Sequence, residues 1–214
     1  MEIEAKFRVD NREHFAALLA ASELGGYVLR AAPHPEQQRN TYYDTADGRL
    51  EQARYGLRIR EVDGKSVATL KGPGTPRNGL HQRAEWEVEA RQPDPATWPV
   101  GEARAEALRL LEGTELLPLL TIETSRHHIV ALRQKESEEQ EIAELALDEG
   151  IIRAKECSRP FCELEIELLP AGTHADLEAL IEAAQQLMPL IPENRSKLEQ
   201  GLTLLKEEKK EEKQ

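Results

Sequence analysis

A row of charged side chains at the start of the chain has the spacing of a divalent-cation site. Charged and apolar residues alternate with period two from Glu2 to Val9, which predicts a β-strand with one buried face. The charged face carries Glu2, Glu4, Lys6 and Arg8. Carboxylates at alternate positions of a strand lie about 7 Å apart and can share a hard divalent cation, which takes oxygen ligands. We expect the lysine that follows to hold an anion that such a cation also contacts.

A second acidic row lies in segment 161–169, towards the other end of the chain. The segment alternates as strictly as the first, with residues such as Leu164 and Ile166 on its apolar face. Its charged face carries three glutamates, Glu163, Glu165 and Glu167. One such strand alone would be an ordinary amphipathic surface strand. Two acidic rows, accompanied by rows of arginine and lysine, favour a binding site instead.

Basic side chains line the polar faces of four further predicted strands. They are Arg58 and Arg60 in segment 55–62, Lys71 in 65–71, Arg83 in 82–90 and Arg126 in 120–132. Glu85 shares a face with Arg83, and Asp148 lies on the acidic face of segment 142–152. Guanidinium and ammonium groups clamp phosphate oxygens, and carboxylates recruit magnesium or manganese. The set therefore predicts a site for a polyanion together with divalent metal ions.

The elements that carry these rows predict an α+β fold that is mainly β. Eight strand candidates, joined mostly by hairpins or short helices, favour an antiparallel sheet. They are segments 2–9, 39–45, 55–62, 65–71, 82–90, 120–132, 142–152 and 161–169. Helices are expected at about 11–23, 49–53, 102–111, 116–120, 176–188 and 196–206. The charged rows are too ionic for a core, so we expect an eight-stranded antiparallel barrel with charged rows inside and apolar rows outside under helices.

Composition restricts the setting of this fold. The 214 residues are most simply one domain, residues 1–205, followed by a charged tail, 206–214. A net charge of −12 argues against a nucleic-acid partner, and the apolar runs are too short to span a membrane. Cys157 and Cys162 make no disulfide framework, and no leader precedes the first strand, so a cytoplasmic location is expected. The oligomeric state, monomer or homodimer, stays open.

At these residues the sequence resembles the CYTH superfamily, the triphosphate tunnel metalloenzymes. The N-terminal signature of that superfamily is Glu-x-Glu-x-Lys, which is Glu2, Glu4 and Lys6 here. Further matching segments are 42–45, 57–60, 69–72, 83–87, 144–148, 162–167 and 196–197, so the resemblance covers nearly the whole chain. Segments 42–45, 80–88 and 196–197 are most similar to the bacterial inorganic triphosphatases. One departure is Thr124, where many members have a second basic residue.

The resemblance implies a tunnel, a C-terminal plug helix and a role for each matching residue. The implied metal ligands, for Mg²⁺ or Mn²⁺, are Glu2, Glu4, Glu163 and Glu165, with Asp148 and Glu85 as further candidates. The expected phosphate clamp is Lys6, Arg58, Arg60, Lys71, Arg83 and Arg126, with Arg8 added because it shares the face of Lys6. Expected catalytic residues are Glu4 and Glu165, which would hold the attacking water, and Lys197 of the plug helix.

The resemblance leaves open what is attached to the triphosphate. Hydrolysis of inorganic triphosphate at its terminal phosphate is our first interpretation. The alternatives are cyclisation of ATP to cyclic AMP, as in class IV adenylyl cyclases, and hydrolysis of thiamine or nucleoside triphosphates. A non-catalytic polyphosphate-binding module is the least favoured, because binding alone would not need two intact acidic rows. His81, His127 and His128 lack the spacing of a transition-metal site.

Overall fold

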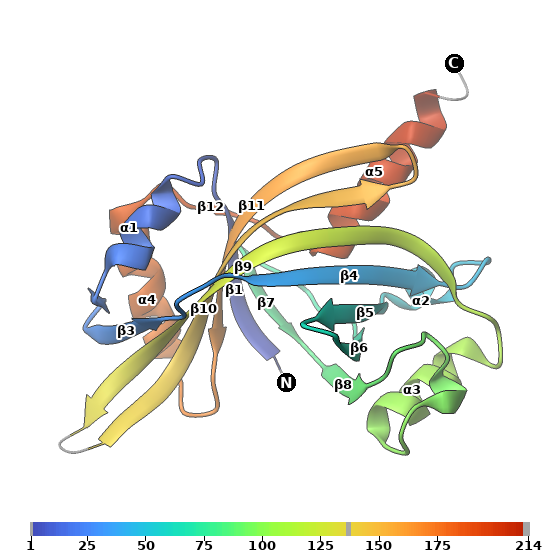
Figure 1. Cartoon of the computed structure of the whole chain (residues 1–214), viewed down its shortest axis with the longest axis horizontal. Helices are drawn as coiled ribbons and strands as arrows, with labels where there is room; N and C mark the ends of the chain where they lie inside the picture. The colour runs from blue at the N-terminus through green and yellow to red at the C-terminus, as the bar shows by residue number, and fades with distance from the viewer. Residues whose placement is uncertain (1, 136–137, 212–214) are drawn as a thin grey trace.

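A curled antiparallel sheet forms the centre of the protein, in a computed structural model that describes residues 2–135 and 138–211 (Figure 1). Within these ranges nine strands follow one another in the order β12-β1-β11-β10-β9-β4-β5-β6-β8. Their bounds are β1 Glu2–Arg8, β4 Glu36–Asp44, β5 Gly56–Val62, β6 Lys65–Lys71, β8 Glu85–Glu89, β9 Leu117–Lys135, β10 Glu138–Ala154, β11 Cys157–Leu168 and β12 Ile191–Pro192. The mainly β, antiparallel barrel is confirmed. The count of eight was too low, because the two-residue strand β12 pairs with the free edge of β1.

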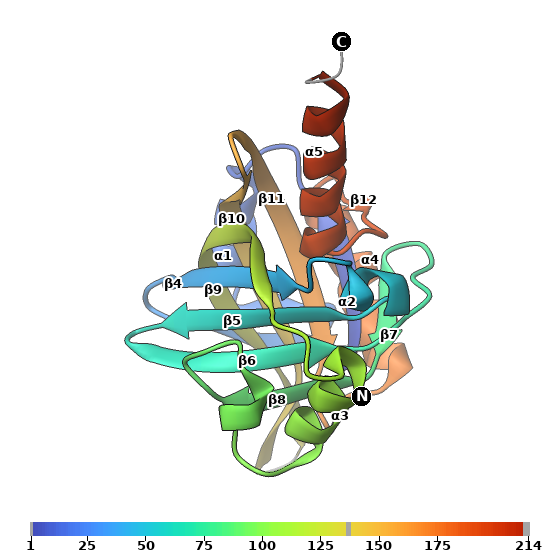
Figure 2. The ribbon, with the colours of Figure 1, turned by 90° about the vertical axis from the view of Figure 1, so that its right-hand side faces the viewer.

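The sheet closes on itself, almost completely, at Ala84. The segment expected to be one strand, 82–90, is two: β7, Leu80–Arg83, pairs with β1, and β8 pairs with β6. Ala84 alone separates them, and its carbonyl oxygen accepts a hydrogen bond of 2.9 Å from the Gly72 amide. Figure 2 shows β4, β5, β6 and β8 side by side across the front of the barrel. Because the chain changes partners at Ala84, β7 pairs with β1 and β8 pairs with β6, and together they close the barrel.

Helices α1, His14–Ala20, and α4, His174–Leu187, cover one outer face of the barrel (Figure 1). Their apolar stripes, with Leu18 and Leu180 fully buried, pack against the outward side chains of β1, β9, β10 and β11. A second outer cluster contains α3, Glu102–Leu111, with Trp98, which follows the short 3-10 helix Pro95–Thr97. Burial of these outer rows leaves the opposite, charged rows to face the inside of the barrel.

Helix α5, Lys197–Glu211, lies across the inner side of the barrel rather than on its outer side. Its Leu204 is buried in a cluster with Leu120 and Ile122 of β9. A Cβ on Gly201 would lie 2.4 Å from a Leu120 methyl, so only glycine allows this close approach of α5 to β9. The helix extends beyond residue 206, so part of the expected tail is helical; residues 212–214 of that tail lie outside the described ranges.

Two local expectations, the helix bounds at 11–23 and the helix at 116–120, were wrong. The helix expected to reach residue 23 ends at Ala20, and a hairpin of β2, Glu23–Leu24, and β3, Tyr27–Ala31, follows it. Gly25 and Gly26, both with positive φ, form the turn of this hairpin rather than a helix end. The helix expected at 116–120 is the start of β9. Pairing with β4 makes these residues extended, although their local pattern favours a helix.

The short helix α2, Arg49–Ala53, connects β4 to β5 as expected. Asp44 holds it, because its carboxylate accepts hydrogen bonds from the amides of Leu50 and Glu51 at 2.8 and 2.9 Å. No helix among residues 2–135 and 138–211 is long and apolar enough to cross a membrane.

Replacement of Gly150 by alanine tests the packing of the long strands. A Cβ on Gly150 would lie 2.2 Å from the backbone oxygen of Glu123 and 2.8 Å from the Phe161 ring. We expect Gly150→Ala to lower the free energy of unfolding by about 1–3 kcal/mol, as overpacking does, measured by chemical denaturation. Gly101→Ala is the control, because nothing lies within 4 Å of its added methyl; it should cost less than about 1 kcal/mol. Equal losses in both variants would contradict the close approach.

Candidate active site

A cavity of about 1050 Å³ inside the barrel is lined mainly by charged and polar side chains. Of the fourteen site residues expected from sequence, all but Glu163 and Arg8 line it. Those that do are Glu2, Glu4, Lys6, Arg58, Arg60, Lys71, Arg83, Glu85, Arg126, Asp148, Glu165 and Lys197. Residues far apart in sequence therefore meet in one place. The roles assigned to them from sequence stay predictions.

Strand register brings the two acidic rows side by side. In β1, Ala5 and Phe7 pack outward into the core, which turns Glu4 and Lys6 inward. Strand β1 pairs with β11 so that Lys6 lies opposite Glu165 and Glu4 opposite Glu167. Lys6 is 3% exposed and Glu4 also 3% exposed, so water screens these charges poorly and neighbouring side chains must balance them.

Glu2 is balanced by two cations at one end of the cavity. Lys71 Nζ lies 2.6 Å from Glu2 Oε1, and Arg83 Nε lies 2.9 Å from Glu2 Oε2. Burial alone would raise the pKa of Glu2, but the charges of Lys71 and Arg83 outweigh it and hold the pKa well below its ordinary value. Lys71 also pairs with Glu85 at 3.1 Å. Strands β1, β6, β7 and β8 therefore meet in one ion-pair network where the barrel closes.

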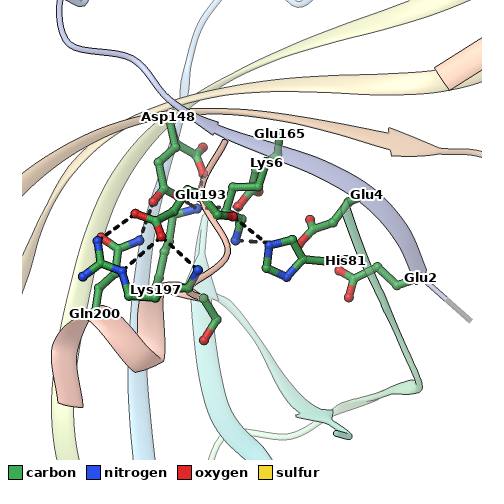
Figure 3. A network of polar contacts seen from close by, with 12 residues as sticks. Glu2, Glu4, Lys6, His81, Asp148, Glu165, Glu193, Lys197 and Gln200 are labelled. Carbon is green, nitrogen blue, oxygen red and sulfur yellow. Dashed lines mark hydrogen bonds and ion pairs between the residues drawn. The ribbon is translucent and has the colours of Figure 1, made fainter. Parts of the chain in front are cut away.

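Lys197 enters the cavity from the first turn of α5 and contacts three carboxylates (Figure 3). Its Nζ lies 2.6 Å from Glu165 Oε1, 2.8 Å from Glu163 Oε2 and 2.9 Å from Asp148 Oδ2. Burial would lower the pKa of Lys197, but the three carboxylates outweigh it and raise the pKa well above its ordinary value. The ammonium therefore stays charged, and it connects α5 to β10 and β11.

Arg126 and Lys6 complete this second network. Arg126 donates two hydrogen bonds to Asp148, at 2.7 and 2.6 Å, and a third to Glu165 at 2.6 Å. Lys6 lies 3.0 Å from Glu165. Burial would raise the pKa of Glu165, yet Lys197, Lys6 and Arg126 together hold it well below its ordinary value. Glu165 is thus an ionised carboxylate held by three cations.

Arg58 and Arg60 differ from the other cavity cations, because neither forms an ion pair with a carboxylate in the described ranges. Arg58 is 9% exposed, its Nε has no hydrogen-bond partner, and its Nη1 lies 3.5 Å from the Tyr42 hydroxyl. Arg60 donates only to the amide oxygen of Asn40, at 3.1 Å. Burial and the charges of Arg58 and Arg126 lower the pKa of Arg60 to about 10. Glu85 and Glu87 act on these two guanidinium groups only from beyond ion-pair distance, so an anion in the cavity could pair with both directly.

The donor set fits a hard divalent cation. All the expected ligands are carboxylates, which such ions prefer, and buried Glu163 Oε2 accepts no well-directed hydrogen bond although Lys197 Nζ lies 2.8 Å away. Burial and the charges of Glu2 and Glu4 raise the pKa of Glu167 to about 7, so these carboxylates repel one another. In the described ranges no three His, Cys, Asp or Glu side chains already converge as metal ligands. Basic side chains occupy the carboxylate oxygens that such a cation would use, as Lys197 does for Asp148, Glu163 and Glu165.

Four residues of the site were not singled out by the sequence analysis. Glu167, Tyr42, Glu144 and His128 all line the cavity. The first three were visible as members of matching segments or of the acidic row, but no spacing rule distinguished them from structural positions. His128 was considered only as a transition-metal ligand; instead its Nδ1 lies 2.8 Å from Glu144 Oε1 and its Nε2 3.6 Å from Glu36 Oε1.

Arg8 does not belong to the clamp. Its side chain is 51% exposed, it pairs with Asp10 at 3.2 Å, and it lines a second cavity of about 1300 Å³ outside the first. Arg8 is the last residue of β1 and continues the alternation, but at this end of the strand the side chain lies at the second cavity. Glu163 lines the second cavity as well, although its carboxylate is 2% exposed and pairs with Lys197.

The nearly closed barrel, with rows of opposite charge facing a common cavity, defines a tunnel protein. A family model described as CYTH domain matches residues 1–202. The chain therefore belongs to the CYTH domain family, the triphosphate tunnel family that the sequence resembles.

Relatives agree with this assignment. The chain is 30% identical over 169 residues to a protein of Haemophilus influenzae named inorganic triphosphatase. That match covers 77% of this chain and 45% of the other protein, so the chain spans about half the length of this curated relative.

Two solved structures share the fold at lower identity. One, a protein from Pyrococcus horikoshii OT3, is 21% identical with a TM-score of 0.59, over 95% of this chain and 99% of that one. Another, from Hippeastrum, is described as a candidate adenylyl cyclase with a dominant triphosphatase activity. It is 20% identical with a TM-score of 0.57, over 95% of this chain and 96% of that one. At these identities the similarity establishes the fold.

His128 should make stability depend on pH. The hydrogen bond to Glu144 outweighs burial and raises the pKa of His128 above its ordinary value. A raised histidine pKa stabilises the fold below the unfolded pKa of about 6.5, and this contribution is lost as the pH rises through the folded pKa. We expect His128→Gln to destabilise more at about pH 5.5 than at about pH 8.5, by less than about 1 kcal/mol because the pair is partly exposed. Denaturation at both pH values measures this, and in a Glu144→Gln background the pH dependence should disappear.

Proposed function

We propose that this chain is a divalent-metal-dependent hydrolase that removes the terminal phosphate from inorganic triphosphate inside the cavity. The observation that carries the proposal is the pair of guanidinium groups, buried Arg58 and half-buried Arg60, that have no carboxylate within ion-pair distance among the described residues. Every other expected clamp residue in the cavity already pairs with an acidic side chain. The wall thus has a fixed excess of positive charge at one place, which suits a chain of phosphates.

The proposed mechanism uses position and charge more than covalent chemistry. Arg58 and Arg60 bind and orient the phosphate chain, and Glu4 and Glu165 hold the water that attacks the terminal phosphorus in line. Lys197 and Lys6 stabilise the charge that develops on the equatorial oxygens. Orthophosphate and pyrophosphate leave as products. A divalent cation bound to the carboxylates would supply further neutralisation of phosphate charge and Lewis-acid polarisation.

The choice of inorganic triphosphate among triphosphates rests on the relative that carries this name. One assay separates the alternatives. Pure protein with Mg²⁺ or Mn²⁺ is given tripolyphosphate, ATP or thiamine triphosphate, and orthophosphate, pyrophosphate and cyclic AMP are quantified. We expect kcat/KM to be highest for tripolyphosphate, with equal amounts of orthophosphate and pyrophosphate. Cyclic AMP as the main product from ATP would instead make the protein a cyclase, and full activity in excess chelator would contradict the role of metal.

Arg58→Ala should weaken substrate binding. The substitution removes a phosphate contact made in the ground state as well as in the transition state, so KM should rise by roughly tenfold or more. Arg39→Ala is the matched control, because Arg39 lies on the neighbouring strand β4 with its side chain 59% exposed. Unchanged KM in Arg58→Ala would remove this residue from the clamp.

Glu4→Gln should slow turnover far more than it weakens binding. The substitution keeps the shape of the side chain and removes the charge that holds water, and loss of one such contribution typically lowers kcat ~10²–10³-fold. Thermal unfolding shows whether the variant is folded, and Glu61→Gln, at a side chain 57% exposed, is the control. Normal turnover by Glu4→Gln would exclude it from the mechanism.

A further inference from the structure

The ammonium group of Lys197 occupies the position where a divalent cation would meet the acidic rows. Its three contacts, with Asp148, Glu163 and Glu165, are all 2.6–2.9 Å long. The side chain is 10% exposed, and its Nζ lies 5.4 Å from the centre of the Phe161 ring. One monovalent cation therefore bridges three carboxylates that are themselves 10% exposed or less.

This bridge leaves the acidic side incompletely satisfied. Among the described residues, only the Lys197 contact with Glu165 has hydrogen-bond geometry, and buried Glu163 Oε2 accepts no well-directed hydrogen bond although the ammonium lies 2.8 Å away. Lys197, Arg126 and Lys6 share the three negative charges, and Glu163 Oε2 keeps a lone pair that no well-directed hydrogen bond uses. A divalent ion, which takes six or more oxygen ligands, would use that lone pair.

The same contacts seat the first turns of α5 in the barrel. Gln200, one turn after Lys197, donates a hydrogen bond of 2.6 Å to Glu163 Oε1, and Leu198 packs against Gly56. Figure 3 shows Lys197 and Gln200 reaching from the helix towards Asp148 and Glu165. A cation that binds these carboxylates in place of Lys197 therefore also removes three of the contacts that hold this end of the helix.

We propose that Lys197 is an internal counter-cation that competes with the divalent ion for Asp148, Glu163 and Glu165, so that cation binding and the seating of α5 are linked. The inference rests on the proposed function in one respect, that these carboxylates bind a divalent ion. Linkage of this kind is reciprocal: a bound cation loosens the first turns of α5, and a seated α5 weakens cation binding. The displaced ammonium then faces the cavity, where the proposed function places the phosphates.

Affinity for Mn²⁺ alone, measured by electron paramagnetic resonance of the free ion, tests the competition. Lys197→Gln should bind Mn²⁺ more tightly by roughly tenfold or more, within the usual range of coupling between sites, and Lys197→Arg should stay near the unaltered protein. Lys206→Gln is the matched control on the same helix, because Lys206 is 64% exposed and, within the described part of the chain, pairs with Glu51 alone. Affinity of Lys197→Gln within about twofold of the unaltered protein would overturn the proposal.

Hydrogen exchange of α5 tests the linkage separately from simple charge removal. In the unaltered protein the Gln200 amide donates to the Ser196 carbonyl at 3.0 Å. We expect Mn²⁺ to speed exchange of the amides at 200–204, and Lys197→Gln to show fast exchange with or without Mn²⁺. Unchanged exchange in the unaltered protein on saturation with Mn²⁺ would overturn the linkage even if the affinities differ. Absence of Mn²⁺ binding in every variant would instead overturn the metal dependence of the proposed function.

Discussion

The fold depends on the balance of buried opposite charges inside the barrel. Glu2, Glu165 and Asp148 are almost without contact with water, and each is within hydrogen-bond distance of at least two cations. An isolated charge in such a position would cost several kcal/mol, and loss of one partner of a buried pair typically costs about 3–5 kcal/mol. The barrel can therefore keep ionised side chains in its interior only as interlocked networks. The apolar rows outside supply the burial that stabilises the whole.

The two ion-pair networks differ in role, because they join different elements. Glu2 with Lys71 and Arg83 joins the strands at the seam of the barrel, whereas Lys197 joins a helix to the sheet. The strands where the barrel closes have no other arrangement that keeps their backbone hydrogen bonds. A helix terminus held by side chains alone can move as a unit. This difference explains why we place the adjustable contacts on the network of Lys197.

Period-two alternation predicted the barrel class and most of the cavity wall, because the inner and outer faces of a strand are fixed by that period. It placed Glu4, Arg58 and Glu165 correctly without any knowledge of neighbours. It failed where the position of a residue depends on contacts between strands rather than on the pattern within one strand. Alternation continues through Arg8 although its side chain lies outside the first cavity, and nothing in the local pattern marks the break between β7 and β8 at Ala84. Gly25 and Gly26 fit a helix end and a hairpin turn equally well from sequence, and only pairing of β3 with β9 distinguishes them.

Closure of the barrel through β1 has a consequence for how the protein folds. Glu4 pairs with His81 on one side and Glu167 on the other, so both seams of the first strand join regions distant in sequence. Chains with such non-local pairing fold slowly, because loop entropy must be lost before the contacts form. The two acidic rows therefore stay apart and hydrated until β1 pairs with β11. Glu2 and Lys6 of β1 therefore lose their hydration in the same step that gives them their partners on other strands.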